Sequence, residues 1–520
     1  MLDKIERTRI IITMAYVIEQ RVKNHVYLYE VESYWDKEKK QSRQKRTFLG
    51  KKDPDTGELL THDDSYAAWD YGHTTLFDQV AKKIGLLKEL QEAFPSIWEE
   101  IYTLALFKLI EGKPFYLCEH WLETVWLNTK PDLSSQRISE ILQSLANKKS
   151  EQFQFFSSWA KRHKKNNRFI VFDITSVSSF GKDIDDLEWG YNRDRETLPQ
   201  INLGVVFARP ADMPLFYSLY PGSIHDVSTL SNIITELQVL SLTTTTFVLD
   251  KGFYSMANLA HMKELRHIIP LPLRTKQETQ LVQKYQDTIR SSHYAIRCND
   301  HVLYCAAEKI TIQDSEYSAY IYLDERKQAD QREHLLKQIL ECEQFVQHKG
   351  YGKRSDFESF FQEQKPGLGQ YFGLHKNGTR YELQRIPEKI DAALNRMGMF
   401  VLITNGDFSG DEVIQLYRDK DGVEKCFDSL KNNLAFKRLR IHSQEALEGV
   451  LFIEFLSLIL YSYAQRILRT TGLTKYMSIP EAIFELRKIK KIRFGRKKTM
   501  ITEITKHQRK ILNAFETSVS

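Results

Sequence analysis

Two aspartates in this sequence each end a run of β-branched and aromatic residues. Residues 168–176 read Arg-Phe-Ile-Val-Phe-Asp-Ile-Thr-Ser, a length and composition typical of a strand buried on both faces. Asp173 is placed where that strand is expected to surface, and Asp250 ends a second such run at residues 245–250. Carboxylate oxygens at the rim of a sheet are suited to holding a metal ion. The alternative for Asp173 is that it caps the turn that follows its strand.

A third acid lies on a predicted helix over residues 411–434. This helix carries a stripe of residues spaced 3, 4, 3 and 4 apart, which helical geometry places on one side: Tyr417, Lys420, Glu424, Phe427 and Lys431. If the neighbouring apolar stripe docks on the sheet, Glu424 points to the edge where the two aspartates emerge. Lys420 and Lys431 then lie one and two turns away, suited to holding phosphates beside a metal. The alternative is a salt-bridged helix face in solvent.

The elements around the two aspartates predict an α/β fold. Strands are expected at residues 168–176, 201–208, 213–220, 245–250 and 267–271, and helices at residues 226–240 and 254–265. The resulting order, β-β-β-α-β-α-β, resembles that of a ribonuclease H-like domain, in which the first and fourth strands lie side by side.

The flanking segments have other patterns. Residues 20–60 alternate aromatic and polar residues as in a small β meander, and their basic run Lys37–Arg46 either contacts DNA or is a solvated charged surface. Helical spacing begins near residue 74, and Ser134 or Ser135 can cap a helix ending near Leu145 that fits a bundle better than a DNA-reading role.

The strand and helix pattern is interrupted after residue 275 by what we interpret as an insertion with its own sheet. The fold class is therefore a ribonuclease H-like catalytic core interrupted by a β-rich insertion, with an N-terminal β and helical region and a basic C-terminal region. The predicted divisions are a β-rich region and candidate DNA contact at 1–72, a helical domain at 73–165, the first part of the core at 166–274, the insertion at 275–395, the second part of the core with the Glu424 helix at 396–470, and the basic region at 471–520.

Composition excludes several classes of protein. The chain has 520 residues, of which 42% are hydrophobic and 27% charged, as in soluble globular proteins. Its 74 Lys and Arg exceed its 68 Asp and Glu only slightly, so the net charge is compatible with a polyanionic partner but does not by itself indicate one. Five cysteines without a CxxC pair argue against structural zinc and a disulfide framework. The longest apolar run, residues 450–463, is too short to span a bilayer, so we expect a buried helix and no membrane partner. Neither a P-loop nor a dinucleotide-binding glycine pattern is present.

These residues together resemble a known family. Tyr417-x2-Lys420-x3-Glu424-x6-Lys431 is similar to the Y-R-E-K signature of DDE transposases from bacterial insertion sequences, with Lys420 in place of the usual Arg. Val-Phe-Asp173-Ile-Thr and Val-Leu-Asp250-Lys-Gly-Phe look like the first two acids of the family's triad. The exchange at position 420 keeps the charge and loses the bidentate fork, so phosphate binding there is expected to be weaker or different.

The resemblance implies a catalytic and metal-binding triad of Asp173, Asp250 and Glu424. Two Mg²⁺ ions, for which Mn²⁺ can substitute, stabilise the attacking and leaving oxygens of a phosphodiester, and a sparse all-oxygen site suits Mg²⁺. The implied reaction is cut-and-paste transposition, in which water nicks the element end and the freed 3′ hydroxyl attacks target DNA. Members of this group typically pass through a hairpin at the element end.

The resemblance also implies the partners. Double-stranded DNA, as terminal inverted repeats and as target, is contacted by Tyr417, Lys420 and Lys431, and two protomers pair on two ends as a homodimer. The basic run 487–498 either neutralises phosphates or is a solvated strand. With no signal peptide evident, we expect a cytoplasmic, nucleoid-associated bacterial protein. The alternatives are a DNA-binding protein derived from a transposase that does not cut, and a ribonuclease H-like nuclease that cuts without joining, which the 174-residue separation of Asp250 and Glu424 disfavours.

Overall fold

The computed structural model divides the chain into two compact units. One unit comprises Met1–Val80, Leu117–Lys130 and Thr474–Ser520, and the other comprises Ala81–Tyr116 and Pro131–Leu473. The structure describes residues 15–23, 25–36, 39–52, 57, 59–61, 66–164, 169–181, 183–190, 198–224, 226–240, 242, 245–272, 275–349, 353–365, 367–377, 380–420, 438–439, 441–494 and 499–519.

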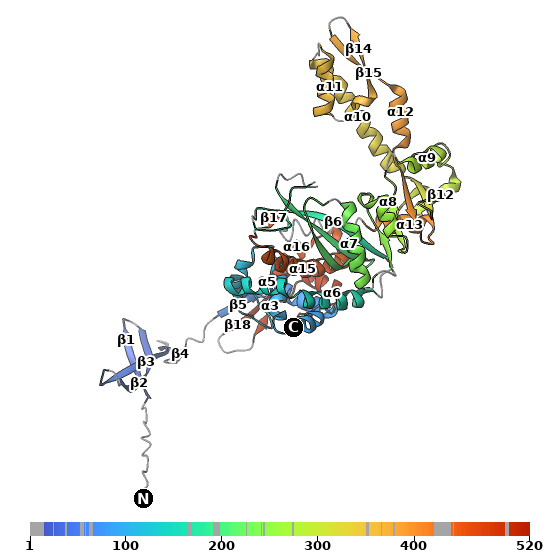
Figure 1. The fold of residues 1–520 in the computed structure, drawn as a ribbon. Coiled ribbons are helices and arrows are strands. Elements are labelled where there is room, and N and C mark those ends of the chain that lie inside the picture. The colour runs from blue at the N-terminus through green and yellow to red at the C-terminus, as the bar shows by residue number, and fades with distance from the viewer. Residues whose placement is uncertain are drawn as a thin grey trace. The chain divides into compact units, whose positions relative to one another are not determined.

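The first unit contains two small sheets (Figure 1). The first is an antiparallel meander of β1 (Ala15–Val22), β2 (His25–Asp36), β3 (Gln41–Lys52) and β4 (Leu59–Thr61), as predicted for this region. The second is formed by β5 (Tyr66–Asp70), β18 (Lys490–Phe494) and β19 (Met500–Ile501). Helices α4 (Cys118–Thr124), α16 (Ile479–Arg487) and α17 (Lys506–Ala514) complete this unit, and α1 (Gly72–Lys83) begins in it.

The second unit is built on a ten-stranded mixed sheet in the order β11-β12-β13-β16-β10-β9-β6-β7-β8, with β17 also paired to β6. The strands are β6 (Phe169–Ser179), β7 (Gln200–Arg209), β8 (Met213–Pro221), β9 (Thr246–Val248), β10 (His267–Pro270), β11 (Ala295–Cys298), β12 (His301–Ile312), β13 (Ser315–Leu323), β16 (Met399–Thr404) and β17 (Arg438–Leu439). All residues of β6 and β7 are buried, because both faces of the sheet centre are covered.

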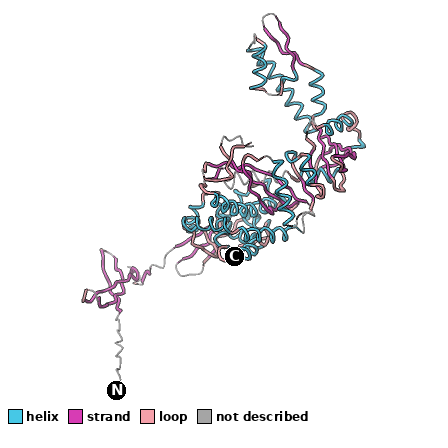
Figure 2. Tube along the Cα trace, viewed as in Figure 1, coloured by secondary structure: helices cyan, strands magenta, loops and turns pink. Residues whose placement is uncertain are grey.

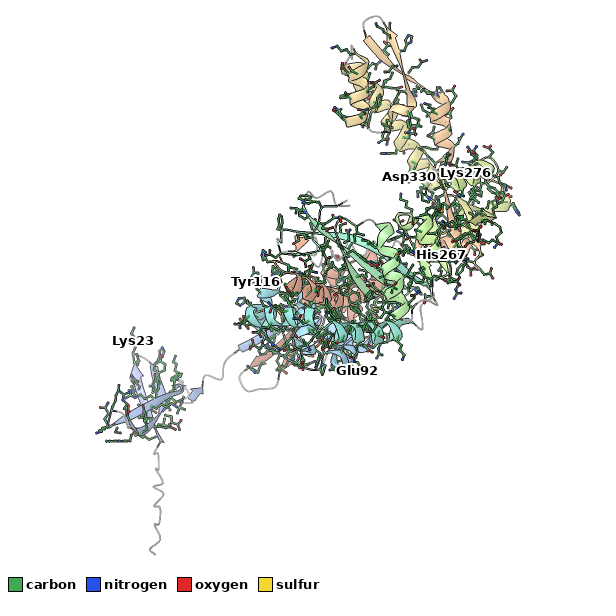
Figure 3. All side chains as sticks on the ribbon, viewed as in Figure 1. Lys23, Glu92, Tyr116, His267, Lys276 and Asp330 are labelled. Atoms are coloured by element: carbon green, nitrogen blue, oxygen red, sulfur yellow. The ribbon has the colours of Figure 1, made fainter. Side chains whose placement is uncertain are left out.

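The predicted order of elements is confirmed. Strands β6, β7 and β8 are antiparallel neighbours, and α7 (Asp226–Val239), β9, α8 (Met256–His261) and β10 follow along the chain. The first and fourth of these strands, β6 and β9, are parallel neighbours. The architecture is thus mixed α/β with a large mixed sheet, consistent with a ribonuclease H-like core. Figure 3 labels His267, which is fully buried where β10 begins.

The expectation that the insertion has a sheet of its own is wrong for its first strands. β13 pairs with β16 along six residues, so β11, β12 and β13 extend the main sheet. This pairing satisfies the backbone groups that the edge of β16 would otherwise leave unpaired.

A separate hairpin in the inserted region is formed by β14 (Phe372–Asn377) and β15 (Arg380–Arg385). It packs with α10 (Glu325–Lys349), α11 (Arg354–Glu363) and α12 (Pro387–Arg396) around buried residues that include Ile339, Phe360 and Leu394. Figure 2 shows the two strands of this hairpin beside helices. Helix α9 (Lys276–Tyr285) precedes these elements in the chain.

Two helices, α6 (Lys149–Lys164) and α15 (Gln444–Thr470), pack against β8 at one end of the main sheet. Helices α3 (Trp98–Glu111) and α5 (Ser135–Asn147) pack on α15, and α2 (Leu86–Ala93) packs on α6 and α3. Trp159 of α6 donates its indole N–H to the carbonyl of Pro214 at 2.8 Å, and Phe455 of α15 contacts the ring of Tyr217 in β8. Ser134 is the N-cap of α5, as predicted.

Helix α15 runs through the helical layer and is buried along most of its length. Among the described residues it is the one helix that is long and apolar enough to cross a bilayer, and 89% of its most apolar window is covered by the protein itself. The predicted buried helix is therefore present.

Candidate active site

The two aspartates follow paired positions of two parallel strands. Val171 of β6 pairs with Val248, the last residue of β9. Asp173 and Asp250 each stand two residues further along, and the backbone at Asp250 is still extended although β9 has ended. Residues two apart in an extended segment share a face, and adjacent strands are separated by about 4.8 Å. We infer from the register that both carboxylates stand at the same level and on the same face of the sheet.

The sequence predicted that Asp173 ends its strand, and this prediction is wrong. β6 continues to Ser179, and Asp173 is only 3% exposed. The alternative that it caps a following turn is therefore also wrong. Its Oδ1 accepts the backbone N–H of Ile174 at 2.9 Å. The run stays extended because the polar residues after Asp173 pair with β7 instead of turning.

The sheet nevertheless opens beside Asp173. β9 ends at Val248, opposite Val171, and β17 pairs with β6 only at Ser178 and Ser179. Among the described residues no strand pairs with residues 172–177 of β6 on this side. Within the described part of the chain, this side of β6 therefore has a local gap in its strand pairing next to Asp173.

Asp250 is the last extended residue before a short 3₁₀ helix. Its side chain is 26% exposed, and its carbonyl accepts the N–H of Phe253 at 3.1 Å. The fully buried Phe253 ring contacts Phe172 of β6, with 5.2 Å between the ring centroids. This contact fixes the turn after β9 against the strand that carries Asp173.

The helix predicted over residues 411–434 is described only up to Lys420, and within that part it ends at Arg418. α13 (Gly410–Arg418) starts with a capping box at Ser409 and ends at Arg418, and residues 419–420 form a turn. Asp419 begins the sequence Asp-Lys-Asp-Gly, whose residue types favour turns over helix interiors. Of the predicted stripe, only Tyr417 lies in α13, and Lys420 lies in the turn after it.

Lys420 lies at the second aspartate. Its side chain is 4% exposed, and its Nζ is 3.6 Å from Oδ1 of Asp250. The sequence predicted that this lysine would face substrate phosphates beside the metal. In the structure its ammonium group lies beside the Asp250 carboxylate, and the phosphate contact stays a prediction.

An ionic network that sequence reasoning missed holds the turn carrying Lys420. Arg209, at the end of β7 and 3% exposed, pairs with Asp212 and lies 3.9 Å from the carboxylate of Asp419. Asp212 also pairs with Arg469 of α15. The residues Arg209-Pro-Ala-Asp212 gave a sequence signal only for a hairpin connection, because their partners lie more than 200 residues away.

Glu424 and Lys431 lie outside the described residues. Within the described part of the chain, no group of three or more His, Cys, Asp or Glu side chains is positioned to hold a metal. Asp183, Asp185 and Asp186 follow β6 closely in the sequence, and we expect them to lie in a surface loop and not to bind the metal. The carboxylate of Asp186 instead accepts the side-chain N–H of Gln444 at 2.9 Å.

The donor set fits a hard divalent cation. Asp173 and Asp250 supply carboxylate oxygens from adjacent strands, one buried and one reachable from solvent. Oxygen ligands without His or Cys are the set that suits Mg²⁺ and Mn²⁺. Since Mg²⁺ keeps several waters and takes oxygens from substrate phosphates, two or three protein carboxylates suffice.

Comparisons with known proteins bear on this site. The family model described as "Transposase DDE domain" matches residues 164–460, more than half of the chain and a span that includes Asp173, Asp250 and Glu424. The cryo-EM structure of a piggyBac transposase synaptic complex with hairpin DNA is similar over 75% of this chain and 70% of that chain, with 8% identity and a TM-score of 0.36. No curated protein matches the chain.

Proposed function

Because the chain belongs to the transposase DDE-domain family, we propose that it is an active transposase of a bacterial insertion sequence. In this proposal it binds the ends of the element, cleaves the DNA by metal-dependent phosphodiester hydrolysis and joins the 3′ ends to target DNA. The observation that supports the proposal best is the parallel register of β6 and β9, which pairs Val171 with Val248, two residues before Asp173 and Asp250.

Asp173, Asp250 and Glu424 are the proposed catalytic residues and metal ligands. Asp173 is held by a strand buried throughout, so its carboxylate has little freedom to move. Asp250 is the more exposed of the pair and is proposed to face the scissile phosphate. Bound Mg²⁺ or Mn²⁺, two ions in this proposal, would lower the pKa of the attacking water or hydroxyl and stabilise the leaving oxygen.

Lys420 is proposed to have two contacts, one with the Asp250 carboxylate and one with a DNA phosphate. Without metal its ammonium group compensates Asp250. We propose that in the complex with DNA the same ammonium group also contacts a phosphate near Asp250. Tyr417 and Lys431 are the further proposed DNA contacts.

The proposed partners are terminal inverted repeats and target DNA, with two protomers forming a homodimer on paired ends. The proposed location is the bacterial cytoplasm, at the nucleoid. These assignments rest on the family and on the resemblance of the Tyr417 to Lys431 segment to the Y-R-E-K group.

The test is a cleavage and strand-transfer assay on labelled duplexes bearing the ends of the element that flanks the gene. Wild type should nick and join in Mg²⁺ or Mn²⁺, whereas Asp173→Asn, Asp250→Asn and Glu424→Gln should bind the ends and not cleave. Asp183→Asn is the matched control, since Asp183 is an exposed acid outside the proposed site.

Each rival function has its own outcome in this assay. A derived DNA-binding protein would bind the ends without nicking in either metal, and a nuclease would cleave without producing joined products. Full cleavage by Asp173→Asn or Asp250→Asn would contradict the proposed site.

A further inference from the structure

Positive charge is concentrated near the C-terminal end of the chain. Residues 473–519 contain twelve Lys and Arg and four Glu, a net charge of +8 in a chain whose total is +6. The remainder of the chain is therefore slightly acidic. The basic character of the protein resides in this segment, which supplies β18, β19, α16 and α17 to the first unit.

One face of the β5–β18 sheet collects aromatic and cationic side chains. In the antiparallel register Lys491 lies opposite Trp69, and Arg493 lies opposite Ala67. Directly opposed residues share a face, as do residues two apart in a strand. Trp69, Lys491 and Arg493 therefore lie on the same face, which we call the ring face.

The acidic residue of these strands lies on the other face. Asp70 and Lys490 occupy the alternate positions of β5 and β18, and they pair with each other there. Arg487 also reaches Asp70, at 3.8 Å. Since β18 and β19 carry no acid and Asp70 points away, the described residues of these three strands place no carboxylate on the ring face.

Two aromatic rings, those of Tyr71 and Trp126, position the ammonium group of Lys491. The Nζ of Lys491 lies 4.6 Å from the ring centroid of Tyr71 and 4.4 Å from that of Trp126. Trp126 in turn meets Trp69 edge to face, with 5.2 Å between ring centroids. Such contacts restrict a long side chain that would otherwise be free to rotate.

Two further cations on the ring face are exposed. Arg493 lies 5.3 Å and Lys130 lies 5.8 Å from the ring centroid of Trp69, and both side chains are open to solvent. Lys130 also donates to the carbonyl of Leu122 at 3.0 Å, which orients its stem. Ring contacts thus position cations at a surface where each can still make charged hydrogen bonds outward.

We infer that the ring face binds the phosphate backbone of duplex DNA, through Lys130, Lys491 and Arg493. Lys491 and Arg493, two residues apart on one strand, are separated by about 6.6 Å along it and present regularly spaced charge to a polyanion. Because the nearby rings are already covered by cations, they are not available to stack on bases. Binding here is therefore sequence-independent and salt-dependent.

The choice of DNA as the polyanion rests on the proposed function, and the ring face adds a second contact region to it. This region belongs to the first unit, whereas Asp173 and Asp250 belong to the second. Loss of the ring face should weaken binding without removing the chemistry at the aspartates.

The test measures affinity for a duplex of random sequence by fluorescence anisotropy, between about 50 and 200 mM salt. EDTA is present so that no cleavage occurs. The double variant Lys130→Gln/Arg493→Gln removes only exposed side chains and should reduce the slope of log affinity against log salt by about 1.8. Adding Lys491→Gln should bring the reduction to about 2.7, and Arg493→Lys should restore the slope that Arg493→Gln loses.

Two controls separate the ring face from a general loss of charge. Lys309→Gln removes an exposed strand cation of the second unit, which is paired with Glu316, and should leave the slope unchanged. Lys490→Gln removes a cation from the same strand but on the opposite face, and it should also leave the slope unchanged. Thermal denaturation of every variant should give a melting temperature close to that of wild type.

If the folded variant that combines Lys130→Gln, Lys491→Gln and Arg493→Gln keeps the wild-type slope of log affinity against log salt, this inference is overturned. The proposed function would still stand in that case, provided that the wild-type protein cleaves DNA. An equal loss in Lys309→Gln would overturn this inference as well. Absence of any DNA binding by wild type would instead remove the proposed function together with the ring face.

Discussion

Replacing Lys420 with Met should tighten the binding of a divalent cation at Asp250. The ammonium group lies 3.6 Å from Oδ1 of Asp250, so a metal that binds this carboxylate must displace or share it. Lys420→Met keeps the apolar stem and removes the charge. The variant thus tests the competition between lysine and metal without leaving a large cavity.

The size of the effect follows from the distance and the exposure. Two unit charges at this separation attract by about 4.6 kcal/mol at an effective dielectric constant of 20, and by about 1.2 kcal/mol in water. Lys420 is 4% exposed, but the Asp250 side chain is 26% exposed, and burying the lysine costs part of the attraction. We therefore expect a net effect of about 1.4 kcal/mol, a tenfold lower Kd for Mn²⁺.

Mn²⁺ binding to the DNA-free protein is measured by electron paramagnetic resonance of the unbound ion. Lys263→Met, at an exposed lysine on the connection between β9 and β10, is the matched control and should bind as wild type does. In an Asp250→Asn background, Lys420→Met should have little effect on the affinity. An unchanged or weaker affinity in Lys420→Met itself would refute the competition, and an equal gain in Lys263→Met would make it a general effect of net charge.

Three further outcomes follow from the structure. Burial raises the pKa of Glu454 from 4.5 to about 7, so the folded protein binds this proton more tightly than the unfolded chain does. The contribution of Glu454 to the free energy of unfolding should therefore fall as pH rises from about 4.5 to 7. Denaturation of Glu454→Gln at a series of pH values should show that this dependence is lost. Gly449→Ala should destabilise the protein by about 1–3 kcal/mol, because an added Cβ would stand 2.4 Å from the carbonyl oxygen of Leu142. Thermal denaturation of this variant, compared with Ser457→Ala, measures the effect. No loss of stability would show that α5 and α15 can separate freely. Asp419→Asn should lower the cleavage rate while leaving end-DNA affinity unchanged, because it weakens the contact with Arg209 that holds the turn of Lys420, and equal losses in rate and affinity would argue against a positioning role.

Local patterns were enough to predict much of the second unit. The runs at β6, β7 and β8 are rich in apolar and β-branched residues, and the structure has strands at all three. The cap of α5 was also predictable, because Ser134 accepts the N–H of Arg137 three residues on. Such elements depend on neighbours in sequence, and neighbours in sequence are what a single chain displays.

The two aspartates were identifiable from sequence, but their environment was not. Asp173 lies within its strand because β7 pairs with β6 on past it to Ser178, and nothing in the local run encodes how far a distant partner extends. The register that aligns it with Asp250 is equally hidden, since a strand buried on both faces has no alternating pattern to fix it.

The tertiary structure alone decided the partners of charged residues. Lys420 lies 3.6 Å from Asp250, 170 residues away in sequence, and Arg209 lies 3.9 Å from Asp419, 210 residues away. A buried charge must find an opposite charge wherever the fold brings one, because desolvation without compensation costs several kcal/mol. Residue types along the chain thus identified the acids and the strands that carry them, whereas the pairing of charges around them depends on long-range contacts that the sequence does not display.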